Sequence, residues 1–265
     1  MTLRVVPFGI VFLLSTLCAA RPTCSPSETF DQPFKAGHDF PRILRDAQSG
    51  NRDAQFLVGM TYEIGCGIDQ DYAQAARWYR KAADGGHPGA QNNLGGLYLQ
   101  GLGVEQSDAE AMKWYLRAAL EGHPAAQNNI GYMYATGRAK LNAGSPQSSA
   151  EEALKWYHKA AKAGYAAAEL NLGLAFFHGT SVRQDLVEAV RWFLKAAGHG
   201  SADACDQLGV VYQHGWGVPQ DYSVAARWYR LADERGFHQA RHDLATLDEL
   251  VRQAASGVGP NRPGH

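Results

Sequence analysis

The sequence lacks the motifs by which most enzymes are recognised. It has no Gly-x-x-x-x-Gly-Lys-Ser/Thr loop for phosphates, no His-Glu-x-x-His for zinc, no Gly-x-Ser-x-Gly nucleophile turn and no Cys-x-x-Cys pair. Ser-x-x-Lys and Lys-Thr-Gly, which mark the serine β-lactamases, are also missing. These absences predict a protein that is not an enzyme and that holds neither a cofactor nor a metal ion.

The chain also lacks an excess of charge of one sign. Lys and Arg number 25 against 26 Asp and Glu, so the formal net charge is -1, and the cations are spread along the sequence without a run. This balance argues against a broad electrostatic footprint for nucleic acid or an anionic membrane. Beyond the first twenty residues no apolar run reaches the roughly twenty residues that a membrane span needs. A hydrophobic content of 45% is nevertheless enough for a substantial core.

Residues 1–20 are predicted to be a cleavable signal peptide. Arg4 gives a positive start, residues 5–17 are mostly apolar, and the Cys-Ala-Ala of residues 18–20 supplies small side chains for a signal peptidase. The alternatives are an uncleaved anchor and a lipoprotein acylated at Cys18, which is disfavoured because a Leu precedes it. We therefore expect a periplasmic or secreted protein.

Three cysteines remain if the chain is cut after residue 20. An oxidising compartment permits one disulfide, and Cys24 and Cys66 form the pair closer to the N-terminal end. Three separate, partly buried thiols, with Cys205 as the third, fit the sequence equally well.

A repeat of about 36 residues is the main signal in the sequence. A Trp followed by Tyr or Phe recurs five times, at steps of 36, 42, 36 and 36 residues, beginning with Trp78, Trp114, Trp156, Trp192 and Trp228. A Gly keeps the same register in each copy, at Gly59, Gly95, Gly131, Gly173 and Gly209. Three residues after each of these stands an aromatic residue, at Tyr62, Tyr98, Tyr134, Phe176 and Tyr212.

Each copy is predicted to form two helices. The first has Ala, Leu and an aromatic residue at four-residue spacing, and it ends at a Gly suited to a left-handed cap. The second begins at an N-cap, followed after three residues by Gln or Glu in the first four copies, which is the spacing of a capping box. The predicted N-caps are Asp71, Ser107, Ser149, Asp185 and Asp221.

Stacked helix pairs bury a continuous core that one pair cannot form alone. We therefore predict an all-α, right-handed superhelical solenoid spanning residues 40–253. Its five copies are expected at about 51–89, 90–125, 126–167, 168–203 and 204–239, with capping helices at 40–49 and 240–253. Residues 21–39 are expected to be flexible and residues 254–265 disordered.

This repeat resembles the Sel1-like repeat, a relative of the tetratricopeptide repeat. The matching pattern is Ala-x-x-x-Leu-Gly-x-x-Tyr-x-x-Gly-x-Gly-Val, then Asp-x-x-x-Ala-x-x-Trp-Tyr-x-x-Ala-Ala-x-x-Gly, and it covers about residues 51–239. The third copy has a six-residue insertion within residues 138–149, and the fourth loses the second Gly of its turn. The resemblance implies a scaffold or adaptor that binds other proteins.

A partner is expected on the first helices, which line the concave face in solenoids of this kind. Positions three before, one after and four after the register Gly vary among the copies, so packing does not fix them. Asn92 and Asn128 could bond the backbone of a bound peptide; the alternative is that the variable residues pack against the next first helix. The predicted partner-binding residues are Phe56, Met60, Asn92, Leu99, Asn128, Tyr132, Leu170, Leu174, Phe177, Asp206 and Val210.

The function predicted from these features is that of a non-catalytic scaffold or regulatory adaptor for a protein or peptide partner. His178 and His214 stand 36 residues apart and could share a metal ion, but no third ligand is in register. One alternative is a β-lactam-binding or -hydrolysing enzyme, described among cysteine-rich members of the family whose paired cysteines this chain lacks. Another is an obligate subunit of an envelope, secretion or motility complex.

Overall fold

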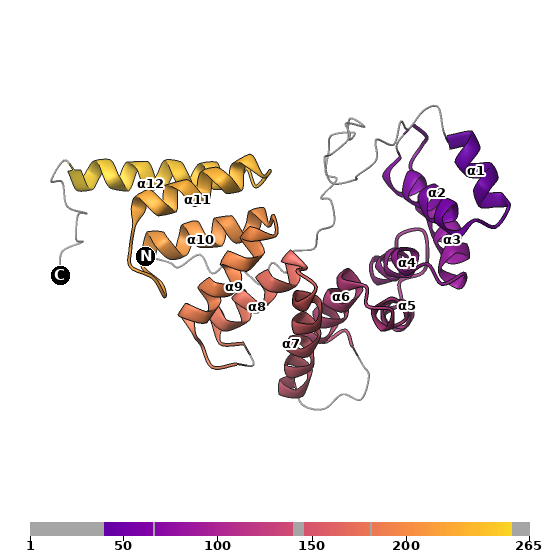
Figure 1. Ribbon diagram of the computed structural model, residues 1–265, viewed down its shortest axis with the longest axis horizontal. Helices are drawn as coiled ribbons and strands as arrows, with labels where there is room; N and C mark the ends of the chain where they lie inside the picture. The colour runs from indigo at the N-terminus through magenta and orange to yellow at the C-terminus, as the bar shows by residue number, and fades with distance from the viewer. Residues whose placement is uncertain (1–39, 66, 140–145, 181, 256–265) are drawn as a thin grey trace. The chain divides into compact units, whose positions relative to one another are not determined.

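The computed structural model describes residues 40–65, 67–139, 146–180 and 182–255, and this part of the chain is all-α, without a strand (Figure 1). It forms two compact units, residues 1–153 and 154–265, each considered by itself. The predicted signal peptide, the segment 21–39, the Cys24–Cys66 disulfide and residues 256–265 of the predicted tail lie outside the described residues.

The helices follow one another as the pairs that the repeat predicts. The N-terminal unit contains α1 (Phe40–Gln48), the pair α2 (Arg52–Ile64) and α3 (Tyr72–Asp84), the pair α4 (Pro88–Gln100) and α5 (Asp108–Leu120), and α6 (Pro124–Ala135). The boundary between the units falls within α7 (Pro146–Lys162). The C-terminal unit continues with the pair α8 (Ala166–His178) and α9 (Leu186–Gly198), the pair α10 (Ala202–His214) and α11 (Tyr222–Glu234), and α12 (Ala240–Ala255).

Within each unit a helix packs on its partner and on the first helix of the next pair. In the N-terminal unit α3 packs on α4 and α5 on α6, while α1 covers α2. In the C-terminal unit α9 packs on α10, and α12 covers α11. The stacking of consecutive helix pairs within each unit is that of the all-α solenoid expected from the sequence.

The repeated Gly and the repeated Tyr or Phe meet within each pair. A Cβ at Gly95 would come within 2.8 Å of the Tyr115 ring, and a Cβ at Gly173 within 2.5 Å of the Phe193 ring. Real side chains do not approach so closely, so only glycine lets the two helices come together at this level. Tyr115 and Phe193 are almost completely buried, at 1% and 0% exposure.

The turn inside each pair is closed by backbone and side-chain bonds. The N–H of Gly101, in the left-handed conformation with φ 72°, donates to the Leu97 carbonyl. The Gln106 amide donates to the Leu99 carbonyl at 3.1 Å. The N–H of Ser107, the N-cap of α5, donates to the Tyr98 carbonyl at 2.9 Å.

This arrangement corrects two details of the predicted caps. The oxygens of Asp71, Ser107, Asp185 and Asp221 do accept from the first helical N–H groups. The N-cap N–H groups, however, donate to carbonyls of the preceding helix, so the return bond of a capping box is not made there. The prediction of Ser149 as an N-cap is wrong, because α7 begins earlier, at Pro146.

Candidate partner-binding surface

A chain of side-chain hydrogen bonds crosses the helix pairs of the N-terminal unit. The Asn129 amide on α6 donates to the Asn92 oxygen on α4 at 3.0 Å, and the Asn92 amide donates to the Asn93 oxygen at 3.2 Å. The Asn93 amide donates to the Tyr79 hydroxyl on α3 at 3.1 Å, and that hydroxyl donates to the Glu63 carboxylate on α2. We call these five residues the amide ladder.

Part of the ladder reaches the surface. Tyr79 is fully buried, whereas Glu63 and the three asparagines are half-buried. Burial raises the pKa of Glu63, and the hydrogen bond from Tyr79 partly offsets this effect. Each amide has two N–H groups and two lone pairs on its oxygen, and the ladder uses only part of this capacity. The exposed side of the ladder therefore offers donors and acceptors in a fixed row.

The other predicted residues of the N-terminal unit divide into two groups. Leu99 and Asn128 are buried, at 1% and 5% exposure, so the prediction that they lie on an open surface is wrong. Phe56, Met60 and Tyr132 are half-buried.

Phe56 is one of the half-buried residues that pack between repeats. Its ring stacks on His87 with centroids 4.3 Å apart and lies 5.8 Å from the Tyr79 ring. Both Phe56 and Met60 pack against the core cluster that contains Leu94 and Trp114. This is the packing that the sequence left open as an alternative to partner binding.

The predicted apolar centre in the C-terminal unit is also partly core. Leu170 is 2% exposed, whereas Leu174, Phe177 and Val210 are half-buried. The Phe177 ring packs on Trp216, in the next repeat, with centroids 5.5 Å apart. Burial of Leu170 contradicts its expected place on an open groove, and the trio of the fourth copy is not a free apolar patch.

Asp206 is a buried acid at the junction with α12. It is 6% exposed, and its Oδ1 has no hydrogen-bond partner among the described residues. Burial, and then the charges of Asp243 and Asp203, raise the pKa of Asp206 to about 7. Asp206, which the sequence predicted to bind a partner, is therefore buried inside the fold and changes its protonation state near neutral pH.

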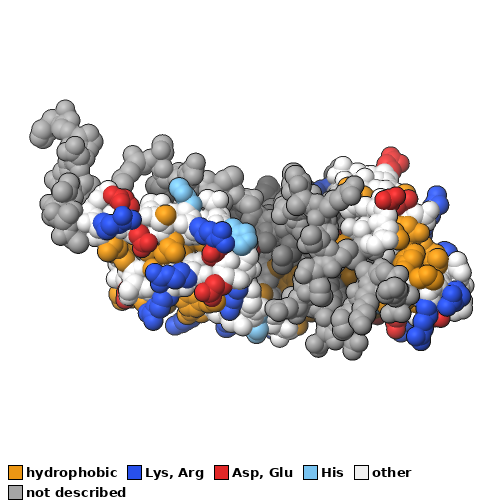
Figure 2. Space-filling view, turned by 90° about the horizontal axis from the view of Figure 1, so that it is seen from above, with side chains coloured by type: hydrophobic (Ala, Val, Ile, Leu, Met, Phe, Trp, Pro, Cys, Tyr) orange, Lys and Arg blue, Asp and Glu red, His pale blue; other side chains and the backbone are white. Residues whose placement is uncertain are grey.

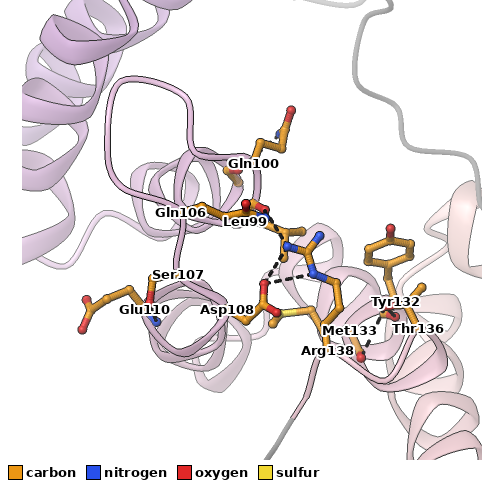
Figure 3. Close-up of polar contacts among 11 residues, drawn as sticks. Leu99, Gln100, Gln106, Ser107, Asp108, Glu110, Tyr132, Met133, Thr136 and Arg138 are labelled. Atoms are coloured by element: carbon orange, nitrogen blue, oxygen red, sulfur yellow. Dashed lines mark hydrogen bonds and ion pairs between the residues drawn. The ribbon is translucent and has the colours of Figure 1, made fainter.

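In the third copy, whose sequence lacks Gly-x-Gly-Val, an ion pair joins Arg138 to Asp108 (Figure 3). In the second copy Gly103 lies so close to the Tyr72 backbone that a Cβ would fall 2.2 Å from its carbonyl carbon. At the equivalent junction Arg138 donates to the Asp108 carboxylate at 2.6 and 2.9 Å and to the Leu99 carbonyl at 2.8 Å. A charged bridge thus takes over a contact that glycine makes elsewhere.

Two open clefts lie at the starts of second helices. One, of about 780 Å³, is lined by Ser107, Asp108, Met112, Lys113, Leu116 and Arg138, among others. The other, of about 730 Å³, lies at the start of α9 beside Gly217. Neither lining contains a cysteine or histidine. Ser107 and Asp185 cap helices, Asp108 pairs with Arg138, and Lys113 pairs with Glu110.

Three of the histidines make capping or stacking contacts. His87 and His123 cap α4 and α6, where each Nδ1 accepts from a backbone N–H, at 3.1 and 3.3 Å. His214 stacks on Trp216 with centroids 4.5 Å apart. Within the described ranges no three His, Cys, Asp or Glu side chains lie together as metal ligands would.

No helix in the described part of the chain is both long enough and apolar enough to span a lipid bilayer.

Several structural residues escaped the sequence analysis although a signal was present. Gln stands just before the N-cap in four copies and closes the turn in each, at Gln70, Gln106, Gln184 and Gln220. The ladder has its own signal, because an Asn-Asn pair occurs at the same place in the second and third copies. The hydrogen bond between Asn129 and Asn92 in those two copies could not be predicted from the sequence and is seen only in the structure.

Comparison with known proteins identifies the family. The Sel1 repeat model matches five times, at residues 52–87, 88–123, 124–165, 166–201 and 202–237. The chain is a member of the Sel1 repeat family, as the resemblance predicted, and Sel1 repeat proteins are generally protein-interaction scaffolds. No curated protein matches the chain.

Solved structures show the same fold. A protective antigen of uropathogenic Escherichia coli with an SLR fold is 31% identical, with a TM-score of 0.65 over 83% of this chain and 45% of its own. This chain thus spans less than half of that antigen. A Sel1 repeat protein from Oxalobacter formigenes is 29% identical, with a TM-score of 0.64 over 78% of this chain and 86% of its own. An immunity protein from Pseudomonas aeruginosa, at 19% identity, a TM-score of 0.55 and coverage of 77% and 76%, shares the fold alone.

Proposed function

We propose that the protein is a non-catalytic scaffold that binds an extended segment of a partner protein along the amide ladder. The carrying observation is the row of half-buried amides of Asn93, Asn92 and Asn129 on α4 and α6. A peptide backbone presents alternating N–H and C=O groups, which side-chain amides can pair from either side. Binding through backbone groups suits a scaffold because it does not depend on one partner sequence.

The ladder is also ordered before a partner arrives. Each asparagine is fixed by a neighbour, and the row ends on a buried Tyr79. Side chains that are already held lose little conformational freedom on binding, which favours affinity. Tyr132, three residues after Asn129 on the same face of α6, adds an amphipathic side chain beside the row.

The compartment proposed for this activity is the periplasm or the exterior of the cell. The support is the sequence of residues 1–20, with its positive start, apolar stretch and small residues. A regulatory adaptor and a permanent subunit of an envelope complex would both use the same surface.

The test compares partner recovery by the wild type and by an Asn92→Ala, Asn129→Ala variant. The matched control is Gln48→Ala with Gln74→Ala, which removes two amides that are not part of the ladder, one from α1 and one from the first turn of α3. Proteins bound to each from extracts of the native host are quantified by mass spectrometry. The proposal predicts one protein whose recovery falls about tenfold or more with the ladder variant and is unchanged with the control. Equal recovery by all three proteins, each with an intact melting transition, would contradict it.

A further inference from the structure

Charge is sorted between the two sets of helices in the C-terminal unit. The first helices, α8 and α10, contain the acids Glu169, Asp203 and Asp206 and no Lys or Arg. The second helices, α7 from residue 154, α9 and α11, contain seven cations, which we call the basic face: Lys155, Lys159, Lys162, Arg191, Lys195, Arg227 and Arg230. The overall charge of -1 conceals this separation.

The cations of the basic face are all exposed, and two are fixed on tryptophan rings. The Lys159 ammonium lies 3.8 Å from the Trp156 ring centroid, and the Lys195 ammonium 4.0 Å from that of Trp192. The stacked lysines are therefore held at defined places on the outside of α7 and α9.

The same three helices also carry five acids, at Glu151, Glu152, Glu188, Asp233 and Glu234. Glu188 pairs with Arg191 at 3.0 Å. Asp233 is already held by Arg241 and His238 of the following segment, at 2.7 and 2.8 Å. On α7, Glu152 and Lys155 each already have an interaction partner. Seven cations against five acids leave these three helices with a net charge of +2.

The positive charges of α7 and α9 converge around His158. Its ring lies 5.5 Å from the Trp192 ring, which places the two helices side by side at this level. Burial, and then the charges of Lys162 and Lys195, lower the pKa of His158, although Glu188 acts against them.

Apolar side chains stand among the cations of α9. Val187 is 52% exposed and Leu194 is 41% exposed. They are seven residues apart with Arg191 between them, so all three share one face of the helix. On the side of the molecule seen in Figure 2, Lys and Arg side chains (blue) lie among Asp and Glu (red) and hydrophobic ones (orange).

We propose that the basic face docks on a lipid bilayer rich in anionic headgroups, with Val187 and Leu194 entering the interfacial region. Clusters of four to eight Lys and Arg bind anionic lipid surfaces, and exposed apolar side chains add to that binding. An acidic segment of a protein would also be attracted to these cations. Such a segment would bind more tightly in a groove lined by them than on an open surface. The cleft at the start of α9 has Arg183 and Val187 in its lining but none of the seven cations of the basic face. This docking is independent of the amide ladder, which lies in the other unit.

The test is co-sedimentation of the purified protein with vesicles of phosphatidylcholine alone or mixed with phosphatidylglycerol. We expect binding to the mixed vesicles only, and its loss at high salt. The variant Lys162→Gln, Arg191→Gln, Arg227→Gln should bind on the order of 100-fold more weakly, about fivefold for each cation removed. The control Arg42→Gln, Arg45→Gln, Arg252→Gln loses the same charge from α1 and α12 and should bind as the wild type does.

Each other outcome overturns the proposal. Equal binding to both vesicle types would show that anionic headgroups are not recognised. Equal weakening by the two variants would show that only total charge matters. Retention on a polyglutamate column without vesicle binding would replace the membrane with an acidic protein as the partner. Circular dichroism of both variants checks that each remains folded.

Discussion

Gly209 and Tyr229 form one contact between the helices of the fifth pair: a Cβ at Gly209 would lie 2.4 Å from Cε1 of the tyrosine ring. The same relation joins Gly59 to Tyr79 and Gly95 to Tyr115. The repeated Gly of the first helix and the repeated Tyr or Phe of the second helix therefore form one packing contact in each of these pairs. The large ring fills the space that the missing side chain leaves, which brings the helices of a pair close together.

Gly209→Ala should destabilise the protein because its methyl group would overlap the buried ring. Overpacking of this kind costs about 1–3 kcal/mol in free energy of unfolding. Gly198→Ala, at the end of α9, is the control, since its Cβ would meet no atom within 4 Å. Because alanine suits a helix better than glycine, that change should stabilise by up to about 1 kcal/mol. Urea unfolding of both variants checks the contrast, and equal effects would show that the contact is not tight.

Trp114→Ala should cost about 3–5 kcal/mol, as expected for a large aromatic side chain removed from a core. Trp114 is 1% exposed and packs in the cluster around Tyr79 and Leu94. Trp216→Ala should cost clearly less, because Trp216 is half-buried and rests mainly on Phe177 and His214. Thermal unfolding followed by circular dichroism ranks the two variants. A greater loss at Trp216 would mean that the core is wrongly placed.

Acid should weaken the caps made by His87 and His123, because each Nδ1 must be unprotonated to accept its hydrogen bond. Burial lowers the pKa of both imidazoles; the charge of Asp53 opposes this at His87, and His87 itself adds to it at His123. The folded pKa thus lies below the unfolded value near 6.5. The stability that these caps contribute is present above that value and is lost as the pH falls through the folded pKa.

The double variant His87→Asn, His123→Asn keeps a good N-cap residue without a titrating group. Its melting temperature should fall less than that of the wild type between about pH 8 and about pH 5. Replacement of the exposed His242 by Asn is the control and should leave the wild-type slope unchanged. Parallel slopes for the wild type and the double variant would contradict the role of the caps.

Asp206 should act in the opposite pH direction. Its folded pKa of about 7 lies above the ordinary value of 3.8, so the fold prefers the protonated acid. Stability therefore falls as the pH rises from about 4 through about 7. Asp206→Asn should stabilise by about 4 kcal/mol near pH 8, with the gain disappearing toward pH 4. Urea unfolding at both pH values measures this gain; Asp248→Asn, on the exposed side of α12, should show none.

The fold followed from the sequence because its contacts repeat in phase. Gly95 and Tyr115 recur at matching places in the other copies, and a short-range pattern of Ala, Leu and aromatic residues predicts each helix. The start of α7 could not be predicted in the same way, because the third copy has an insertion in place of the Gly-x-Gly-Val sequence that precedes the second helix in other copies.

The candidate site was harder to predict. Positions of the first helix whose residue type varies among the copies were expected to be exposed. Leu99 and Leu170 vary in type yet are buried, since any side chain of suitable size can fill those places. Asn92 was selected, but as a free amide, whereas it bonds Asn129 of the next repeat. Contacts between residues 37 positions apart depend on the stacking of the pairs, which the sequence of one copy does not contain.

Crosslinking from the first-helix face tests the central claim most directly. A photoreactive benzoylphenylalanine at Tyr132 keeps an aromatic side chain three residues from Asn129. The same probe at Leu120, 83% exposed on α5, is the control on a second helix. After irradiation in the native host, we expect the probe at Tyr132 to capture one protein, and that adduct to disappear when Asn92→Ala and Asn129→Ala are added. Capture of that protein from Leu120 alone, or an adduct at Tyr132 that persists in the ladder variant, would contradict binding along the amide ladder.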